Sequence, residues 1–164
     1  MSYDFAIVGG TFNSYTFQTA NLIVYEVKFK PTPYLFGESS SFAPHVYEFS
    51  IIVANNPTAA NPAFDDRTSH TIAAIFTSFF NRSDELIIIY ICDSSDGRQL
   101  TRKRKFNSWF YSFVDEDFVK YDDILRDVNG EKYPVALILK EQNPYKAQII
   151  SEFIALIGGY NVGK

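Results

Sequence analysis

The sequence contains little of what several classes of protein require. It has one cysteine, Cys92, so no intrachain disulfide can form, and two histidines, His45 and His70, which are too few for a structural zinc site without several carboxylates. Its longest apolar run, Leu86 to Cys92, is too short to span a bilayer. The first residues, Met1 to Asp4, include an acidic side chain and do not form the basic region of a signal peptide. We therefore expect a soluble cytoplasmic protein without membrane association, metal or cofactor.

An excess of positive charge is also missing. Fifteen lysines and arginines stand against nineteen aspartates and glutamates, which gives a formal net charge of -4. A bulk nucleic-acid binder usually carries an overall basic footprint, so this balance argues against that class and leaves only a local basic patch open. The glycine pairs at 9–10 and 158–159 match no phosphate-binding fingerprint, and no serine lies in a G-x-S-x-G pattern.

What the sequence has in abundance is aromatic residues, with sixteen phenylalanines and eleven tyrosines. Phenylalanine and tyrosine each bury a large apolar area, so most of this excess should form a core. The length of 164 residues fits one domain, and no linker interrupts it. We therefore expect residues 1–164 to form a single domain.

The periodicity predicts an α+β domain with about six strands and three helices, in the order βββαβαββα. Charged and apolar residues alternate from Val24 to Lys30, which is typical of a strand with one wet face. Asn129-Gly130 indicates a hairpin near the C-terminal end, and a short connection at Ala20-Asn21 indicates another near the start. Hairpins at both ends favour a mixed, mostly antiparallel sheet. The expected strands cover 15–19, 22–30, 46–54, 85–92, 118–127 and 133–141.

Apolar residues at intervals of three and four predict the helices. The first helix begins at Asp65 or Asp66, and the third begins at Asn143-Pro144 and stops at Gly158-Gly159. The second runs from about 98 to 114, and its buried stripe is expected to contain Phe106, Trp109, Phe110 and Phe113.

The densest cluster of functional groups lies in this second helix and the turn before it. Five of the fifteen basic residues fall between Arg98 and Lys105, just after a strand that reads as buried on both faces. Ligands tend to bind at the carboxyl ends of strands in open sheets, and a helix N-terminus with basic side chains favours an anion. The candidate ligand-binding residues are Arg98, Arg102, Lys105, Asp93 and Asp96.

A structural interpretation competes with this site. Arg102 lies four residues before Phe106 and therefore falls on the buried stripe, where a charge needs a partner. We expect Arg102 to be a buried clamp on one of the available carboxylates, Asp93, Asp96 or Asp66. Arg98 is the better candidate for a ligand contact. A magnesium ion held by Asp93 and Asp96, alone or together with Asp65 or Asp66, is a weaker alternative, since aspartate is common in turns. Cys92 ends an apolar run and is expected to be a buried, inert thiol.

Two segments resemble a known family. Asp65-Asp66-Arg67 leading into 71–75, and the stretch from Ile91 to Gln99 continuing through Phe106 and Trp109-Phe110, are similar to small proteins of unknown function chiefly from Bacteroidetes. The resemblance spans most of the chain from about Tyr15. It implies a bacterial cytoplasmic origin but no activity, cofactor or catalytic residue.

The order of elements also resembles the second half of the Gcn5-type acetyltransferase fold. In that family a glycine-rich turn before the first of these helices binds the pyrophosphate of acetyl-CoA. The corresponding segment here, Asn61 to Arg67, contains no glycine, and its two aspartates would repel a pyrophosphate. Cofactor binding does not follow from this likeness.

Two classes of function remain. The first is a non-enzymatic binding protein that recognises a protein or an anionic ligand. The second is an enzyme on an acetyltransferase-like scaffold with its site around Asp93 to Lys105. We favour the first, because no cluster has the spacing that a known chemistry demands. A homodimer is compatible with either.

Overall fold

The computed structural model describes residues 1–62, 65–92, 97–113 and 116–161. These form seven strands and three α-helices, with a short 3-10 helix before the fourth strand. The strands are β1 (Phe5–Gly9), β2 (Ser14–Gln18), β3 (Val24–Pro31), β4 (Val46–Asn55), β5 (Ile87–Ile91), β6 (Phe118–Arg126) and β7 (Lys132–Lys140). The helices are η1 (Ala43–His45), α1 (Asp66–Phe80), α2 (Gln99–Phe113) and α3 (Lys146–Asn161).

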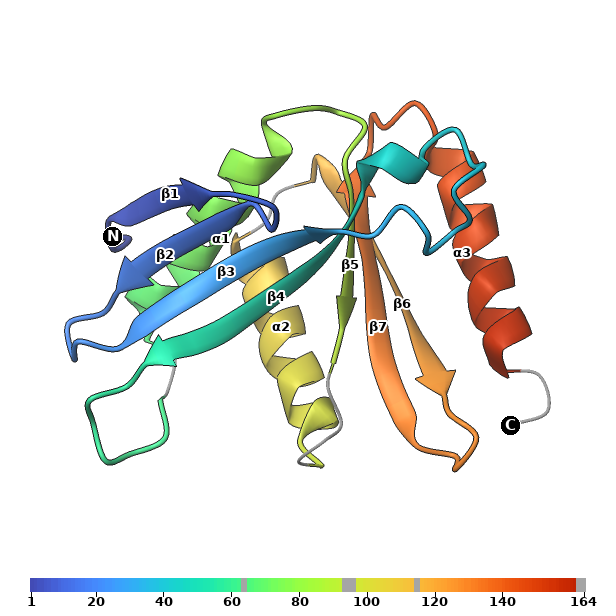
Figure 1. Ribbon diagram of the computed structural model, residues 1–164. Coiled ribbons are helices and arrows are strands. Elements are labelled where there is room, and N and C mark those ends of the chain that lie inside the picture. Colours follow the sequence, from blue (N-terminus) through green and yellow to red (C-terminus); the bar gives the residue numbers. More distant parts are fainter. Residues whose placement is uncertain (63–64, 93–96, 114–115, 162–164) are drawn as a thin grey trace.

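All seven strands belong to one sheet in the order β1-β2-β3-β4-β5-β7-β6 (Figure 1). Only β4 and β5 run parallel to each other, and every other neighbouring pair is antiparallel. The predicted α+β class and the mixed, mostly antiparallel sheet are thus confirmed, with seven strands where about six were expected.

The extra strand is β1, which carries no alternation of polar and apolar residues. Ile7 and Val8 are both exposed, although they point to opposite faces. An edge strand that contributes little to the core has no period-two pattern of apolar residues, so this strand could not be predicted from periodicity.

The prediction that the third helix stops at Gly158-Gly159 is wrong. The helix continues through Gly158 and Gly159 to Asn161, whose side chain reaches the outer strand β6. Its Nδ2 donates to the Ile124 carbonyl at 2.8 Å, and its Oδ1 accepts from the Arg126 N–H at 2.9 Å. These bonds fasten the helix end to a sheet edge, which overrides the stop that a glycine pair suggests.

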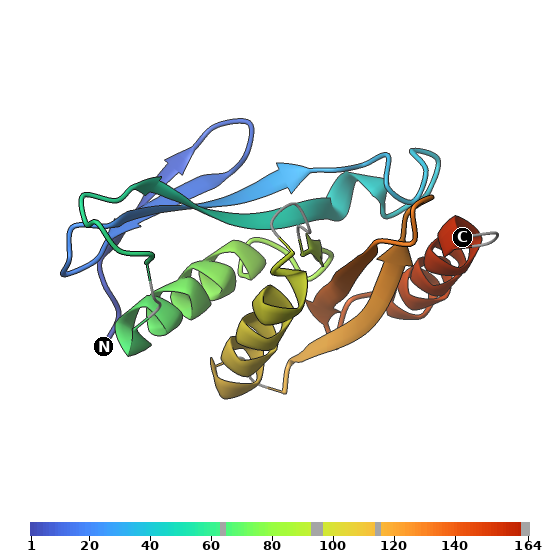
Figure 2. The same ribbon diagram turned by 90° about the horizontal axis from the view of Figure 1, so that it is seen from below.

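The helices cover the sheet on both faces. Figure 2 shows α1 and α2 beneath the strands β1 to β4, and α3 beside β6 and β7 at the other end. In β5 the side chains alternate between the two layers: Ile88 packs with the α1 and α2 side, and Ile87 and Ile89 pack with the α3 side. Burial on both faces explains the unbroken apolar run in this part of the sequence.

No helix in the described ranges is long and apolar enough to cross a membrane.

Candidate functional site

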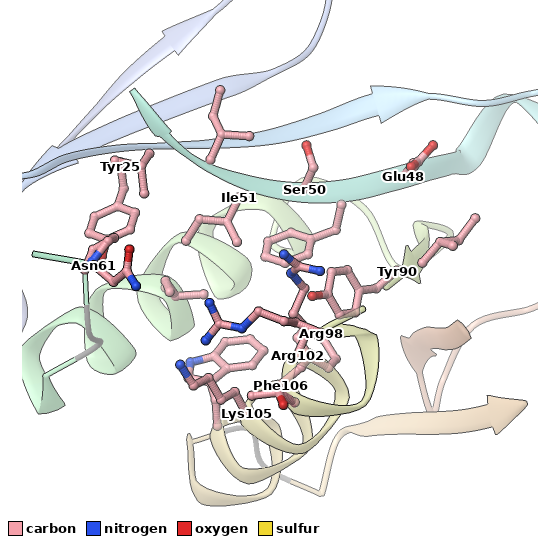
Figure 3. A pocket seen from close by; sticks show the side chains of 18 residues that line it. Tyr25, Glu48, Ser50, Ile51, Asn61, Tyr90, Arg98, Arg102, Lys105 and Phe106 are labelled. Atoms are coloured by element: carbon pink, nitrogen blue, oxygen red, sulfur yellow. The ribbon is translucent and has the colours of Figure 1, made fainter. Parts of the chain in front are cut away.

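A pocket of about 580 Å³ opens between β4, the end of β5 and helix α2 (Figure 3). Pockets of this size are typical of ligand sites. Its wall combines aromatic rings, branched aliphatic side chains and a group of cations. The lining residues are Tyr25, Glu48, Phe49, Ser50, Ile51, Ile52, Val53, Asn61, Pro62, Ile72, Tyr90, Ile91, Arg98, Thr101, Arg102, Lys105, Phe106 and Trp109.

Three of the five residues predicted as ligand-binding line this pocket. Arg98 directly precedes α2, and Arg102 and Lys105 follow it at intervals of four and three, so the three side chains lie along one stripe at the start of the helix. Figure 3 shows the guanidinium groups of Arg98 and Arg102 in the space between α2 and β4. The other two predicted residues, Asp93 and Asp96, lie outside the residues that the structure describes.

Arg102 is less buried than the clamp prediction requires, but the clamp on a carboxylate stays a prediction, because Asp93 and Asp96 lie outside the described residues. Arg102 is half-buried, and Arg98 and Lys105 are exposed. Arg102 lies one turn before Phe106 on the same side of α2 and lines the pocket. Figure 3 shows its guanidinium group directed into the opening. Arg102 is therefore placed where a ligand can reach it.

Stacked rings form the floor of the pocket. The rings of Tyr90 and Phe106 stack with centroids 4.3 Å apart, and Phe49 lies edge-on to Tyr90 at 5.6 Å. Trp109 is 7% exposed, and its Nε1–H donates to the Ser69 carbonyl at 2.8 Å, which joins α2 to α1. The prediction that Phe106, Trp109 and Phe110 would be buried is confirmed, and the side chain of Phe113 lies outside the described part.

Two described protic groups beneath the pocket, those of Tyr90 and Cys92, are not set up as nucleophiles. Burial raises the pKa of Tyr90, and the neighbouring Cys92 raises it further. Burial also raises the pKa of the Cys92 thiol, against the opposing effects of its hydrogen bond with Tyr90 and of nearby cations such as Arg102. Both groups stay protonated at neutral pH, and Cys92 is the buried thiol that the sequence predicts.

The N-terminus of α1, near Asn61 and Pro62, is already occupied by a side chain of this protein. Asp65 Oδ1 accepts from the Thr68 N–H at 2.6 Å, and its Oδ2 accepts from the Tyr3 hydroxyl at 2.7 Å. Burial alone would raise the pKa of Asp65, but these hydrogen bonds and the charge of Arg67 lower it overall. The helix end is thus capped by a carboxylate and does not offer free N–H groups to an anion at that position.

The β4 wall of the pocket was not found from the sequence. The parallel pairing of β4 with β5 covers Val46 to Glu48 against Ile87 to Ile89. Beyond these pairs the two strands diverge, as Figure 1 shows, and α2 lies behind the gap. In the sequence, Ser50 is an ordinary strand position and Asn61 an ordinary loop position. No local pattern shows that two paired strands will separate beside them.

The comparison with protein families rests on the middle and C-terminal parts of the chain. Residues 64–155 match the model described as a family of unknown function (DUF6169). The chain belongs to this family. The match runs from just before α1 into α3, so it includes the stripe of cations on α2, whereas the β4 wall precedes it. No curated protein and no solved structure matches the chain.

Proposed function

We propose that this chain is a binding protein that takes up an anionic ligand in the pocket between α2 and β4. The observation that carries the proposal is the stripe of Arg98, Arg102 and Lys105 lining an aromatic-walled pocket in a protein of net charge -4. Cations gathered against the overall charge of a protein attract an anion, and arginine binds carboxylate and phosphate groups through paired N–H donors.

The electrostatics of the wall support an anion over a cation. Among the described residues that line the pocket, Glu48 is the one carboxylate, and Figure 3 shows it pointing away from the arginines, on the far side of β4. The stacked rings of Tyr90 and Phe106 make the floor less polar than water, and a less polar environment strengthens the attraction between a ligand charge and the guanidinium groups. A ligand with an anionic group and an apolar or aromatic part fits both features.

Binding is favoured over catalysis by two titratable protic groups that the structure describes beneath the pocket. The Tyr90 hydroxyl and the Cys92 thiol both have raised pKa values and remain protonated. We place this function in the cytoplasm of a bacterium, since a single buried free thiol is compatible with a reducing compartment and the sequence resembles a bacterial family.

An acyl-CoA-dependent enzyme is the second candidate, and one observation favours it. The pocket is bordered by Asn61 and Pro62, in the segment before α1 that corresponds to the pyrophosphate-binding turn of the acetyltransferases. The same segment also provides the argument against it, because Asp65 caps α1 and would face the pyrophosphate. Under this candidate the phosphates would have to bind the cations of α2.

Thermal melts in the presence of anions test the proposal. Inorganic phosphate at millimolar concentration should raise the Tm of the wild type, since a ligand that binds only the folded state stabilises it. The shift should be lost in Arg102→Ala and kept in Arg104→Ala, a matched charge removal at an exposed position of the same helix that does not line the pocket. Equal shifts in the wild type and Arg102→Ala would refute the site.

Coenzyme A and acetyl-CoA distinguish the two candidates. If the second is correct, coenzyme A should raise the Tm far more than phosphate at equal concentration, and acetyl-CoA should release free thiol in the presence of an acceptor amine. If coenzyme A acts no more strongly than phosphate or adenosine diphosphate, the anion-binding proposal stands and the acyl-CoA candidate is excluded.

A further inference from the structure

The gap beside the pocket leaves one edge of β4 open. The strand continues from Glu48 to Asn55, but among the described residues no strand pairs with its β5 side beyond Glu48. On its other side, β4 pairs with β3 along nearly its whole length. An open strand edge carries a row of N–H and C=O groups that can pair with another chain.

The hydrogen bonds at the ends of the strands show which groups face the gap. The Thr32 N–H donates to the Val46 carbonyl at 2.9 Å, so Val46 and every second residue after it point their backbone groups toward β3. Ile51 and Val53 therefore direct their N–H and C=O groups toward the gap. By the same alternation the Cys92 N–H, which donates to Pro134, places Ile91 of β5 facing the gap from the opposite side.

These backbone groups border the same pocket that the basic side chains of Arg98, Arg102 and Lys105 line. Ile51, Val53 and Ile91 all line it, and so do residues from both faces of β4, such as Ser50 and Phe49. A pocket lined from both faces of a strand passes along the edge of the strand. From Phe49 to Val53 this edge extends for about 13 Å at the usual rise per residue.

We infer that the anionic ligand is an acidic peptide segment, which binds in extended form as an added strand on the open edge of β4. The inference rests on the proposed anion binding and adds the class of ligand. A peptide backbone repeats its N–H and C=O groups with the period of the open edge, which is the basis of strand addition. Ile52 and Val53 are 43% and 42% exposed and offer apolar contacts beside that edge. The cations on α2 select an acidic sequence.

Fluorescence anisotropy with labelled heptapeptides tests the inference on the full chain. The panel alternates glutamate with valine, serine or phenylalanine. Each peptide has two controls. The first is N-methylated at alternate amides, which keeps the charge and prevents strand pairing. The second has lysine in place of every glutamate. The best acidic peptide should bind at least tenfold more tightly than its N-methylated and lysine counterparts. Arg102→Ala should weaken it at least fivefold, and Arg104→Ala should leave the Kd unchanged.

A backbone variant tests the edge itself. Ile51→Pro removes one N–H that faces the gap, at an edge position where a strand tolerates proline. Once its melt shows a folded protein, the variant should lose at least fivefold in affinity for the acidic peptide and keep the phosphate-induced Tm shift. If the variant does not fold, the N-methylated peptides decide the same question on the wild type.

The possible outcomes separate this inference from the proposed function. Equal binding of acidic and N-methylated peptides would overturn strand addition and leave anion binding intact. The same holds if phosphate or coenzyme A stabilises the protein while no peptide of the panel binds. If neither phosphate nor any acidic peptide has an effect, both the inference and the proposed function are wrong.

Discussion

The two faces of the sheet are packed with different kinds of side chain. On the face covered by α1 and α2, rings dominate, and Phe29 and Phe79 stack with centroids 3.9 Å apart. On the face covered by α3, branched aliphatic residues such as Ile87, Leu137 and Leu139 are fully buried. Strands β5 and β7 contribute to both faces, so the contrast comes from the helices and from the strands β1 to β4.

The difference shows where this fold leaves room for a ligand. The aliphatic layer fills the space between β5, β7 and α3, where the strands are paired in full. The aromatic layer extends to the place where β4 and β5 diverge, and there the rings of Tyr90 and Phe106 border an open pocket. We therefore expect changes in the aliphatic layer to affect stability alone and changes beside the pocket to affect ligand binding as well.

Trp109→Ala should have the largest effect on stability, a loss of about 3–5 kcal/mol in the free energy of unfolding. The substitution removes a buried indole that packs on Phe76 and Phe106 and bonds to the Ser69 carbonyl. Trp109→Phe keeps a ring and loses only the N–H donor, so it should cost much less. Urea denaturation measures both, and a loss below 1 kcal/mol for the alanine variant would contradict the packing described.

Leu137→Ala probes the closed aliphatic layer and should cost about 2–5 kcal/mol, because Leu137 is fully buried and its deletion leaves a cavity. Since this residue lies away from the pocket, the Tm shift caused by phosphate should be the same size as in the wild type. A reduced phosphate shift would show that the two faces are coupled and would break the comparison.

Asp65→Ala should cost about 1 kcal/mol through loss of the α1 cap. The pKa of Asp65 is lowered, so its charged form stabilises the folded state above its usual pKa near 3.8, and this contribution disappears as the pH falls through the lowered value. Asp65→Asn keeps a capping side chain without the charge. Its stability deficit relative to the wild type should be present at about pH 6 and shrink toward about pH 3. A deficit that grows on acidification would reverse the assigned sign.

Ile51→Ala should have the smallest effect, about 0.5–1 kcal/mol, although it also removes a branched aliphatic side chain. Ile51 is half-buried and lines the pocket, so its truncation enlarges an existing opening and leaves no closed cavity. Comparing its denaturation curve with that of Leu137→Ala sharpens the contrast between the faces. Equal losses would mean that the pocket wall is as tightly packed as the interior.

The positions of the main helices and hairpins followed from local patterns. The stripe through Phe106 and Trp109 and the turn at Asn129-Gly130 depend on residues that are neighbours along the chain, and both were predicted correctly. The same helical spacing placed Arg98 and Arg102 on one line, and the structure adds Lys105 to the same pocket wall. Whether they bind a ligand stays a prediction.

Other features depend on contacts that no local pattern encodes. Strand β1 pairs at the edge of the sheet and buries few of its side chains. Helix α3 continues beyond Gly158 and Gly159, because the side chain of Asn161 forms hydrogen bonds with β6. The opposite wall of the pocket exists because β4 leaves β5 after Glu48. The partner of Glu48 in the parallel register, Ile89, is distant in the chain, so no local pattern could show where the two strands separate.

The sequence by itself therefore determined the periodic elements, the aromatic excess and the line of positive charge on α2. Only the tertiary structure decided what that line faces. Helical spacing fixes which side chains share a face, because the helix closes its own hydrogen bonds within four residues. The divergence of β4 from β5 depends on how distant segments pack, since strand pairing and sheet twist are set by partners far away in the chain.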